Sequence, residues 1–307
     1  MVKVLTDADI RERLTAPDAV AWMRDAILAA HDGRLHTPPR VHAELGAGNL
    51  VFTTGALEGE WYGYRSYDTF PTDPGSQMVV VHDWTSGDVR GVAVGNELGP
   101  RRVGAIGAVA VDALANPAAT SLGLVGAGPQ AWTQLWAISA VRTLSEVRVF
   151  SRDPVRRNAF VARVSEELGL PAVAAGSAQE AVEGQDLVVL ATSSPTPVLE
   201  ADWIAPGAYV TTLGPKQVGR AEFGPDLVAR ADVAVTDSVA QTSAYDPPFV
   251  LAGTPQHERL TSLGAVLAGD APGRRSPDQT VIFCSVGLAG TEAFLLARLI
   301  DRLHGVQ

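Results

Sequence analysis

The chain has 307 residues, of which 46% are hydrophobic and 19% are charged, and its formal net charge is -10. This composition excludes a disordered or low-complexity protein, and the length favours two domains over one. The acidic balance, without a basic stripe, argues against nucleic acid as the main partner, because phosphate binding requires clustered Lys and Arg side chains.

Export, membrane insertion and metal binding are not expected either. The single cysteine, Cys284, allows no intramolecular disulfide. Residues 1–5 lack the long apolar region of a signal peptide, and no apolar run approaches the ~18 residues that span a bilayer. The six histidines show no metal-ligand spacing. We therefore predict a cytoplasmic protein without membrane contact and without a metal site.

The first third of the chain predicts one helix followed by an antiparallel sheet. A helix is expected at residues 17–31, where apolar residues recur at helical spacing after Pro17. Short strand-like runs separated by Gly, Pro and Asp then follow, at 51–52, 62–67, 78–81 and 89–94. A further helix is expected at 105–114.

From residue 121 onward, strands and helices alternate. Strands are expected at 121–125, 146–150, 187–191, 208–213 and 233–236, and helices at 130–142, 154–168 and 290–303. Strands that alternate with helices indicate a parallel sheet covered on both faces. The sequence thus predicts an α/β protein in which a Rossmann-type, doubly wound domain accompanies an α+β domain.

A glycine-rich turn joins the first of these strands to its helix. The apolar residues 122–125 run into Gly126-Ala127-Gly128-Pro129-Gln130, and Ala131 takes the place of a third glycine. Such a turn allows close backbone approach, and the free N–H groups of the helix N-terminus attract a pyrophosphate. We predict a dinucleotide site at this turn.

The residues after the second strand bear on the choice of cofactor. An acid there would hold the ribose of NAD, but Ser151 occupies the expected position and Arg152 follows it, where an arginine suits the 2′-phosphate of NADP. This pattern favours NADP(H). The alternative is that Asp153 acts as the acid, which leaves NAD(H) possible.

Two further loops are expected at the same edge of the sheet. Thr192, Ser193 and Ser194 follow the strand at 187–191, and Leu213 and Gly214 end the strand at 208–213. Because ligands of open α/β sheets bind beyond the carboxyl ends of the strands, we expect these residues to contact the cofactor.

Three stretches resemble the ornithine cyclodeaminase/mu-crystallin family. They are LGPRRVGA at 98–105, the Gly126 turn with its following helix, and FCSVGLA at 283–289, after which Glu292 stands where the family usually has an acid. The resemblance implies a homodimer. It also implies a substrate-binding and dimerisation domain of residues 1–115, completed by a helix at 288–307, and an NAD(P)-binding domain of residues 116–287.

The same resemblance implies that positive side chains between the domains hold a substrate carboxylate. Arg102 matches the family's carboxylate arginine, and Arg40 matches a second one. A guanidinium suits this role because it donates two parallel hydrogen bonds to a carboxylate.

Several positions depart from the family's cyclodeaminases. Arg65 stands where the family has a lysine near the substrate, and Val103 stands where it has a threonine. Phe52 stands where the cyclodeaminases have an acid, and Lys216 stands where they have the aspartate that acts on the amino acid. The loss of two acids argues against ornithine cyclodeamination, which requires a base.

The reaction that remains is hydride transfer to a C=N bond. The sequence predicts an NAD(P)H-dependent reductase of a small cyclic imine or an amino-acid-derived ketimine, with Arg65 polarising the substrate. Lys216, beside Arg65 and Arg102, would have a lowered pKa and supply the proton. The alternative, which the sequence supports equally, is that Lys216 has no catalytic role and only pairs with the cofactor phosphate or with an acid such as Glu222. The other hypotheses are an amino-acid dehydrogenase or cyclodeaminase that uses NAD, and an NADPH-dependent small-ligand-binding protein like mu-crystallin.

Overall fold

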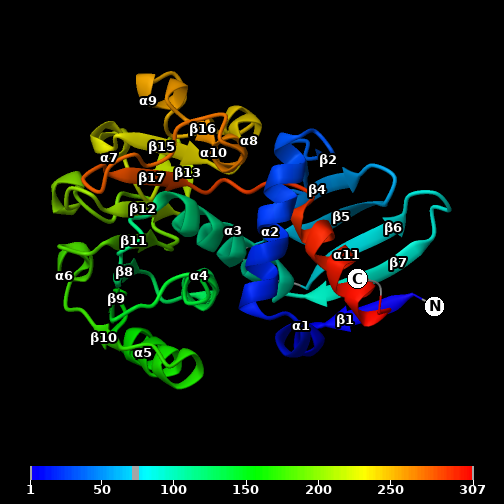
Figure 1. Cartoon of the computed structure of the whole chain (residues 1–307), viewed down its shortest axis with the longest axis horizontal. Helices are drawn as coiled ribbons and strands as arrows, with labels where there is room; N and C mark the ends of the chain where they lie inside the picture. The colour runs from blue at the N-terminus through cyan, green and yellow to red at the C-terminus, as the bar shows by residue number, and fades with distance from the viewer. Residues whose placement is uncertain (1, 71–75, 306–307) are drawn as a thin grey trace. The chain divides into compact units, whose positions relative to one another are not determined.

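The computed structural model of this chain describes residues 2–70 and 76–305 (Figure 1). The chain forms two compact units, one of Met1–Arg102 with Gly287–Gln307 and one of Val103–Val286. The division falls within helix α3 (Leu98–Leu114), whereas the sequence suggested a boundary just after that helix.

The first unit contains a mixed, seven-stranded sheet within the described residues. The strand order is β1-β7-β6-β5-β4-β2, with β3 paired to β4, and only β1 and β7 run parallel among these pairs. The strands are β1 (Lys3–Thr6), β2 (Leu35–His36), β3 (Val41–Glu44), β4 (Asn49–Leu57), β5 (Trp61–Asp68), β6 (Gln77–Asp83) and β7 (Val89–Gly95). The predicted antiparallel runs are confirmed as parts of β4 to β7, while the parallel strand β1 was not predicted.

Two helices from opposite ends of the sequence cover one face of this sheet. The C-terminal helix α11 (Thr291–Leu303) packs against α2 (Ala16–His31) and against strands β4 to β7; Figure 1 draws it in red beside the blue α2. Phe294 of α11 meets Trp61 of β5 edge to face, with ring centroids 6.1 Å apart. Both helices confirm the sequence prediction. A short helix, α1 (Asp7–Arg13), precedes α2.

The second unit contains eight parallel strands in the described part of the chain. Their order is β10-β9-β8-β11-β12-β17-β15-β16. The strands are β8 (Ser121–Val125), β9 (Glu146–Phe150), β10 (Ala172–Ala174), β11 (Leu187–Leu190), β12 (Tyr209–Thr212), β15 (Val233–Thr236), β16 (Thr261–Ser262) and β17 (Val281–Cys284). The strand order changes direction at β8: β9 and β10 follow on one side of it, and β11 and β12 on the other. The Rossmann-type prediction is confirmed.

The helices of this unit flank the strands from which they emerge. Helices α4 (Pro129–Ile138) and α5 (Pro154–Leu168) follow β8 and β9, and the short α6 (Ala178–Val182) packs against both strands. Two expectations were inexact: α3 starts seven residues earlier than predicted, at Leu98 rather than 105, and α4 ends at Ile138 rather than at 142.

The remaining elements are short and were not predicted. They are the 3-10 turn at Ala201–Trp203, strands β13 (Lys216–Gln217) and β14 (Arg220–Ala221), and helices α7 (Pro225–Arg230), α8 (Val239–Ser243), α9 (Pro255–Glu258) and α10 (Leu263–Ala268). The pair β13–β14 is antiparallel and follows β12 directly, so it lies in the loop beyond the carboxyl end of that strand.

Candidate functional site

A cleft of about 690 Å³ lies at the carboxyl ends of β8, β9 and β11 in the second unit. Ten of the twelve residues expected to bind the cofactor line it: Gly126, Ala127, Gly128, Pro129, Gln130, Ser151, Arg152, Thr192, Ser193 and Ser194. The other two, Leu213 and Gly214, do not belong to its lining. The strand order thus brings together segments that lie up to about 70 residues apart in the chain.

The two glycines of the turn have different environments. Gly126 has φ +125°, and a Cβ there would collide with the carbonyl oxygen of Ala191 on the adjacent strand. Gly128 is the N-cap of α4, receives no side-chain cap from the described residues, and would place a Cβ in open space. Gly126 therefore serves the fold. Gly128 leaves the uncapped helix N-terminus accessible to an anion, as a pyrophosphate requires.

The loop after β9 presents positive charge to the cleft. Arg152 and Arg156 both line it. Asp153 also lines it, but its Oδ1 already accepts the backbone N–H groups of Val155 (2.9 Å) and Arg156 (3.1 Å) as the N-cap of α5. The carboxylate that would hold an NAD ribose is thus partly committed to the helix.

Two of the three hydroxyl groups after β11 are used in hydrogen bonds within the second unit. Thr192 Oγ1 donates to Glu222 (2.8 Å) and Ser194 Oγ donates to the carbonyl of Thr196 (2.7 Å). Ser193 lines the cleft, and its hydroxyl group makes no hydrogen bond to any residue that the structure describes. Of the three predicted contacts, Ser193 is the one whose hydroxyl group is available to a ligand.

A buried acid, Glu222, binds the backbone of the loop after β12, and the sequence did not assign this acid to the cofactor site. Glu222 Oε1 accepts the backbone N–H groups of Leu213 (2.9 Å) and Gly214. Lys216, at the start of β13, is buried and its Nζ donates to the carbonyl oxygen of Leu213 (2.9 Å). Leu213 and Gly214 thus shape this loop through their backbone.

A second group of functional side chains lies in the first unit, around Glu292 at the start of α11. Arg65 on β5 donates from Nη1 to Glu292 Oε1 (2.7 Å), and Arg102 on α3 donates from Nη2 to the same oxygen. Arg65 also donates twice to Gln77 Oε1, from Nε (3.0 Å) and Nη2 (2.6 Å), and its guanidinium stacks 4.2 Å above the Tyr67 ring. All three nitrogens of the Arg65 guanidinium and one of its faces are therefore in contact with neighbouring side chains.

Electrostatics at this cluster favour the ionised acid. Burial opposes the charge on Glu292, but the neighbouring Arg102 and Arg65 guanidinium groups outweigh burial and lower the pKa of Glu292 to about 2. Arg102 keeps two buried nitrogens, Nε and Nη1, without a hydrogen-bond partner among residues 2–70 and 76–305. The hydrogens of Nε and Nη1 lie on different sides of the guanidinium, so each of these buried donors can give a carboxylate one charge-assisted hydrogen bond.

Arg40 approaches the same place. A Cβ built on Gly287 would lie 3.5 Å from Arg40 Nη2 and 3.7 Å from Arg102 Nη1, so the two guanidinium groups converge at the SVGLA stretch. Gly287 has φ +93°, a conformation that side chains disfavour. A glycine there leaves room beside both arginines.

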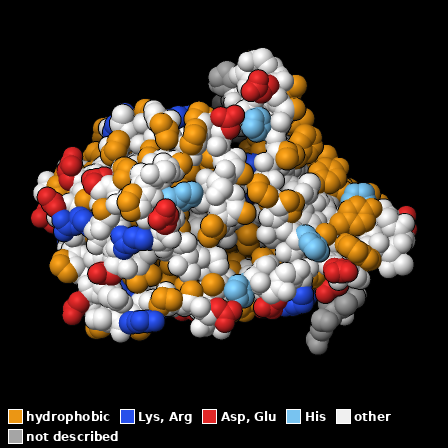
Figure 2. Space-filling view, turned by 90° about the horizontal axis from the view of Figure 1, so that it is seen from above, with side chains coloured by type: hydrophobic (Ala, Val, Ile, Leu, Met, Phe, Trp, Pro, Cys, Tyr) orange, Lys and Arg blue, Asp and Glu red, His pale blue; other side chains and the backbone are white. Residues whose placement is uncertain are grey.

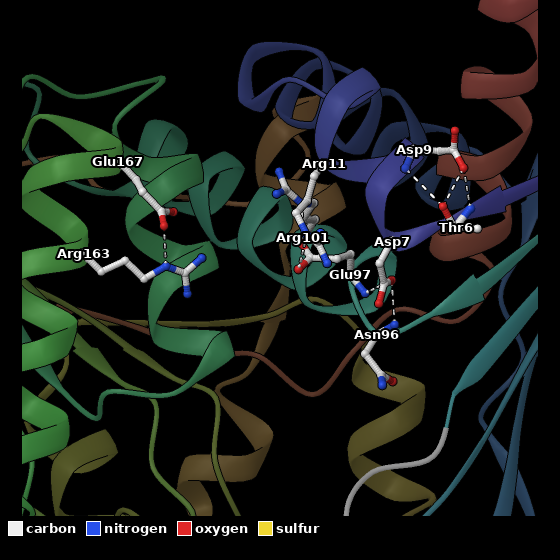
Figure 3. A network of polar contacts seen from close by, with 9 residues as sticks. All are labelled: Thr6, Asp7, Asp9, Arg11, Asn96, Glu97, Arg101, Arg163 and Glu167. Atoms are coloured by element: carbon white, nitrogen blue, oxygen red, sulfur yellow. Dashed lines mark hydrogen bonds and ion pairs between the residues drawn. The ribbon is translucent and has the colours of Figure 1, made fainter.

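The start of α3, which carries Arg102, is fixed by acids of the first unit. Asp7 Oδ1 accepts the backbone N–H groups of Asn96 and Glu97, both at 2.8 Å. Glu97 in turn receives Arg11 (3.1 Å) and Arg101 (3.0 Å), as Figure 3 shows. The helix therefore begins at a defined point, and Arg102 follows Arg101 with its side chain directed to Glu292.

Three residues of these sites escaped sequence reasoning or were undervalued by it. Gln77 was not noticed, because a glutamine at the start of a strand carries no local signal. Glu222 was considered only as a partner for Lys216, and Glu292 only as a family acid. The pairing of Arg65 with Glu292 joins residues 227 positions apart, which no local pattern reveals.

The chain matches a known protein family along almost its whole length. The model of the ornithine cyclodeaminase/mu-crystallin family matches residues 1–305. The chain belongs to this family. A protein of Rhizobium meliloti (strain 1021) named as a dehydrogenase is 30% identical over 295 residues, which cover 92% of this chain and 89% of that protein. A Delta(1)-pyrroline-2-carboxylate reductase of Bacillus cereus is 27% identical over 73% of this chain and 70% of its own.

Solved structures agree over the full length of this family member. The probable ornithine cyclodeaminase from Bordetella pertussis Tohama I has a TM-score of 0.91 at 26% identity, and covers 99% of this chain and 98% of its own. The Thermococcus litoralis Delta(1)-pyrroline-2-carboxylate reductase, solved with NADH and L-proline, has a TM-score of 0.89 at 25% identity, and covers 100% and 99%. Among residues 2–70 and 76–305, no helix is long and apolar enough to cross a membrane.

Proposed function

We propose that this family member is an NAD(P)H-dependent oxidoreductase that reduces the C=N bond of a small cyclic imine or an amino-acid-derived ketimine bearing a carboxylate. The observation that carries the proposal is Arg102, whose buried Nε and Nη1 have no hydrogen-bond partner among the described residues. A substrate carboxylate beside Gly287 would accept from Arg102 Nη1, and Arg40 supplies a second guanidinium at the same place. The similarity to pyrroline-2-carboxylate reductases supports the same substrate class.

The chain's residues have distinct tasks in this reaction. When bound, the dihydronicotinamide supplies a hydride for the imine carbon. The imine nitrogen then requires a proton, which Lys216 provides, directly or through a water molecule that it holds. Arg102 and Arg40 orient the carboxylate. Because Gln77 and Glu292 engage all three nitrogens of the Arg65 guanidinium, this arginine acts on the substrate through its charge and by fixing Glu292.

The cofactor in this proposal is preferentially NADP(H). Arg152 and Arg156 line the cleft after β9, where an adenosine 2′-phosphate is expected, and Asp153 is partly committed to capping α5. Guanidinium groups suit a phosphate because of their charge and paired donors. NAD(H) remains the alternative, and the related Thermococcus litoralis enzyme was solved with NADH.

A second copy of this chain is the proposed partner. The sheet face opposite α11 exposes Tyr62, Met78, Val94 and Val4, which the strand register places on one side of β5, β6, β7 and β1. An apolar sheet face left uncovered by helices is typical of a dimer interface. On the face drawn in Figure 2, Lys and Arg side chains are scattered among carboxylates, which gives no support to nucleic-acid binding. The proposed location is the cytoplasm.

The first experiment is a fluorescence titration of the purified protein with NADPH and NADH, followed by NADPH oxidation on a panel of cyclic imines with and without a carboxylate. Tight NADPH binding with turnover of the carboxylated imines is the expected result. Preference for NAD with ammonia release from an amino acid would replace the reductase by a dehydrogenase or cyclodeaminase. Cofactor binding without turnover on any imine would leave a ligand-binding protein. Light scattering in the same buffer measures the mass of the assembly.

A further inference from the structure

We propose that Glu222 is the positioning residue of the cofactor site, because it fixes the loops after β11 and β12 relative to each other. The proposal rests on the proposed function in that it names these loops as part of a nicotinamide site. Its geometric core, a carboxylate that joins two loops at the edge of a sheet, is independent of the cofactor.

The side chain of Glu222 is fully buried and both of its oxygens are used. Oε2 accepts the backbone N–H (3.0 Å) and the hydroxyl group (2.8 Å) of Thr192. Oε1 accepts the backbone N–H groups of Leu213 (2.9 Å) and Gly214. An ionised carboxylate accepts about four hydrogen bonds, so all of its acceptor sites are filled. Each oxygen holds one loop.

The backbone around Glu222 makes the same connection. Its N–H donates to the carbonyl of Pro215 (2.9 Å), and its carbonyl accepts the N–H of Val198 (3.0 Å). The N–H of Ala221 donates to the carbonyl of Pro195 (3.1 Å). The loop at 191–198 and the loop at 213–216 are thus both tied to one short segment, and the first of these loops supplies much of the cleft lining.

The loops after β11 and β12 approach each other closely at Gly214. A Cβ built on Gly214 would collide with the carbonyl of Thr192 and with the Glu222 carboxylate, so only glycine permits the contact. In the same loop, Lys216 Nζ donates to the carbonyl of Leu213, whose N–H is held by Glu222. Glu222 therefore determines where Ser193 and Lys216 stand with respect to each other.

A glutamine at this position would disturb the arrangement without changing its size. The amide nitrogen is a donor, and it would face either the N–H of Thr192 or those of Leu213 and Gly214. Opposed donors in a buried site cannot all be satisfied. The loops would separate by a small distance while the sheet below remained intact.

Asp186 offers a matched control in the same sheet. Its Oδ2 accepts the backbone N–H groups of Thr120 (2.9 Å) and Ser121 (3.0 Å) and the hydroxyl group of Ser121 (2.9 Å). Asp186 directly precedes β11, so it joins strands at the amino edge, away from the cleft. The variants Asp186→Asn and Glu222→Gln thus remove comparable carboxylates from opposite edges of one sheet.

The test measures amide hydrogen exchange, NADPH affinity and thermal unfolding for both variants. Glu222→Gln is expected to speed exchange about tenfold at residues 191–198 and 213–217 and to weaken NADPH binding about tenfold, because it leaves a buried donor unsatisfied. Asp186→Asn is expected to lower Tm without either effect. Thr192→Val removes the hydroxyl group that donates to Glu222 and accepts the N–H of Ser194 (3.2 Å), and provides a milder variant if Glu222→Gln does not fold.

The outcomes separate the two proposals. Unchanged exchange in both loops of Glu222→Gln overturns the positioning role, whatever the cofactor does. Equal losses of NADPH affinity in Glu222→Gln and Asp186→Asn also overturn it, because the effect would then follow stability alone. If the unmodified protein binds neither NADPH nor NADH, the proposed function fails, and exchange in the two loops still decides the role of Glu222.

Discussion

Arg102 donates one hydrogen bond to Glu292 and keeps Nε and Nη1 unpaired within the described part of the chain, although all three nitrogens are buried. The acid thus holds Nη2 in place, while Nε and Nη1, on different sides of the guanidinium, keep no hydrogen-bond partner. Such an arrangement is costly for folding alone, because buried donors without partners destabilise a protein. It becomes favourable when a carboxylate arrives.

The first prediction concerns this guanidinium group. Arg102→Met is expected to raise KM for a carboxylate-bearing imine at least tenfold, since one hydrogen bond between charged groups contributes ~1.5–3 kcal/mol. An imine that lacks the carboxylate should show little change. Steady-state kinetics on the two substrates measure the difference, and Arg13→Met, which removes a solvent-accessible ion pair with Asp9 on α1, is the control. Equal effects on both substrates would count against carboxylate binding.

The second prediction concerns acid stability. The pKa of Glu292 is lowered on folding from its ordinary 4.5 to about 2. The stabilisation from its ionised form is therefore complete above about pH 4.5 and is lost as the pH falls toward 2, by ~3 kcal/mol in total. Urea unfolding of the unmodified protein and Glu292→Gln across this range should show a shallower acid limb in the variant. Parallel limbs would contradict the ionised buried acid.

The third prediction contrasts the two glycines of the turn. Gly128→Ala places a methyl group where the pyrophosphate is expected, so NADPH affinity should fall at least tenfold while Tm stays within a degree or two. In Gly126→Ala the added methyl group collides with the Ala191 carbonyl, and the positive φ is unfavourable for alanine. This variant should lower the free energy of unfolding by ~1–3 kcal/mol. Calorimetry and cofactor titration on both variants decide. Loss of stability in both would make the turn a packing feature only.

The fourth prediction addresses cofactor selectivity. Arg152→Ala and Arg156→Ala are each expected to weaken NADPH binding about tenfold and to leave NADH binding unchanged, because only NADPH carries the extra phosphate. Arg163→Ala is the control on the same helix, since Arg163 pairs with Glu167 on α5 (Figure 3). Equal losses for both cofactors would indicate a nonspecific charge effect and would favour NAD.

The fifth prediction tests the proton donor. Lys216→Met is expected to lower kcat by about 100-fold or more, as loss of a general acid does, with NADPH affinity retained. Lys216→Arg keeps a positive charge able to donate to the Leu213 carbonyl but does not exchange protons near neutral pH. Activity restored by Lys216→Arg would assign Lys216 a structural role.

The features that sequence reasoning located were those with a local pattern. The β8–α4 turn has its glycines, apolar strand and helix within about ten residues, and the helices at 154–168 and 290–303 have clear periodicity. Both arginines that converge at Gly287 were found through the family motifs. Their geometry was not, because Gly287 and Arg40 are far apart in the sequence and their proximity depends on how the sheet of the first unit folds.

The unpredicted features depend on long-range pairing. The strand β17 was noticed only as part of a motif, because four apolar residues fit a buried helix as well as a strand. Gln77 and Glu222 have no pattern around them, and their roles follow from side chains that arrive from other elements. A polar residue becomes functional through its neighbours, and single-sequence reasoning does not supply those neighbours.

The position of β17 has a consequence for biosynthesis. This strand lies between β12 and β15, yet it is made after both of them, and α11, which covers the first sheet, is made later still. While the ribosome translates residues 237–280, the edges of β12 and β15 that β17 will join are unpaired in the second unit, and α11 does not yet cover the sheet of the first. Neither core closes until β17 and α11 have emerged, so the newborn polypeptide stays exposed to chaperones and proteases until that point of synthesis.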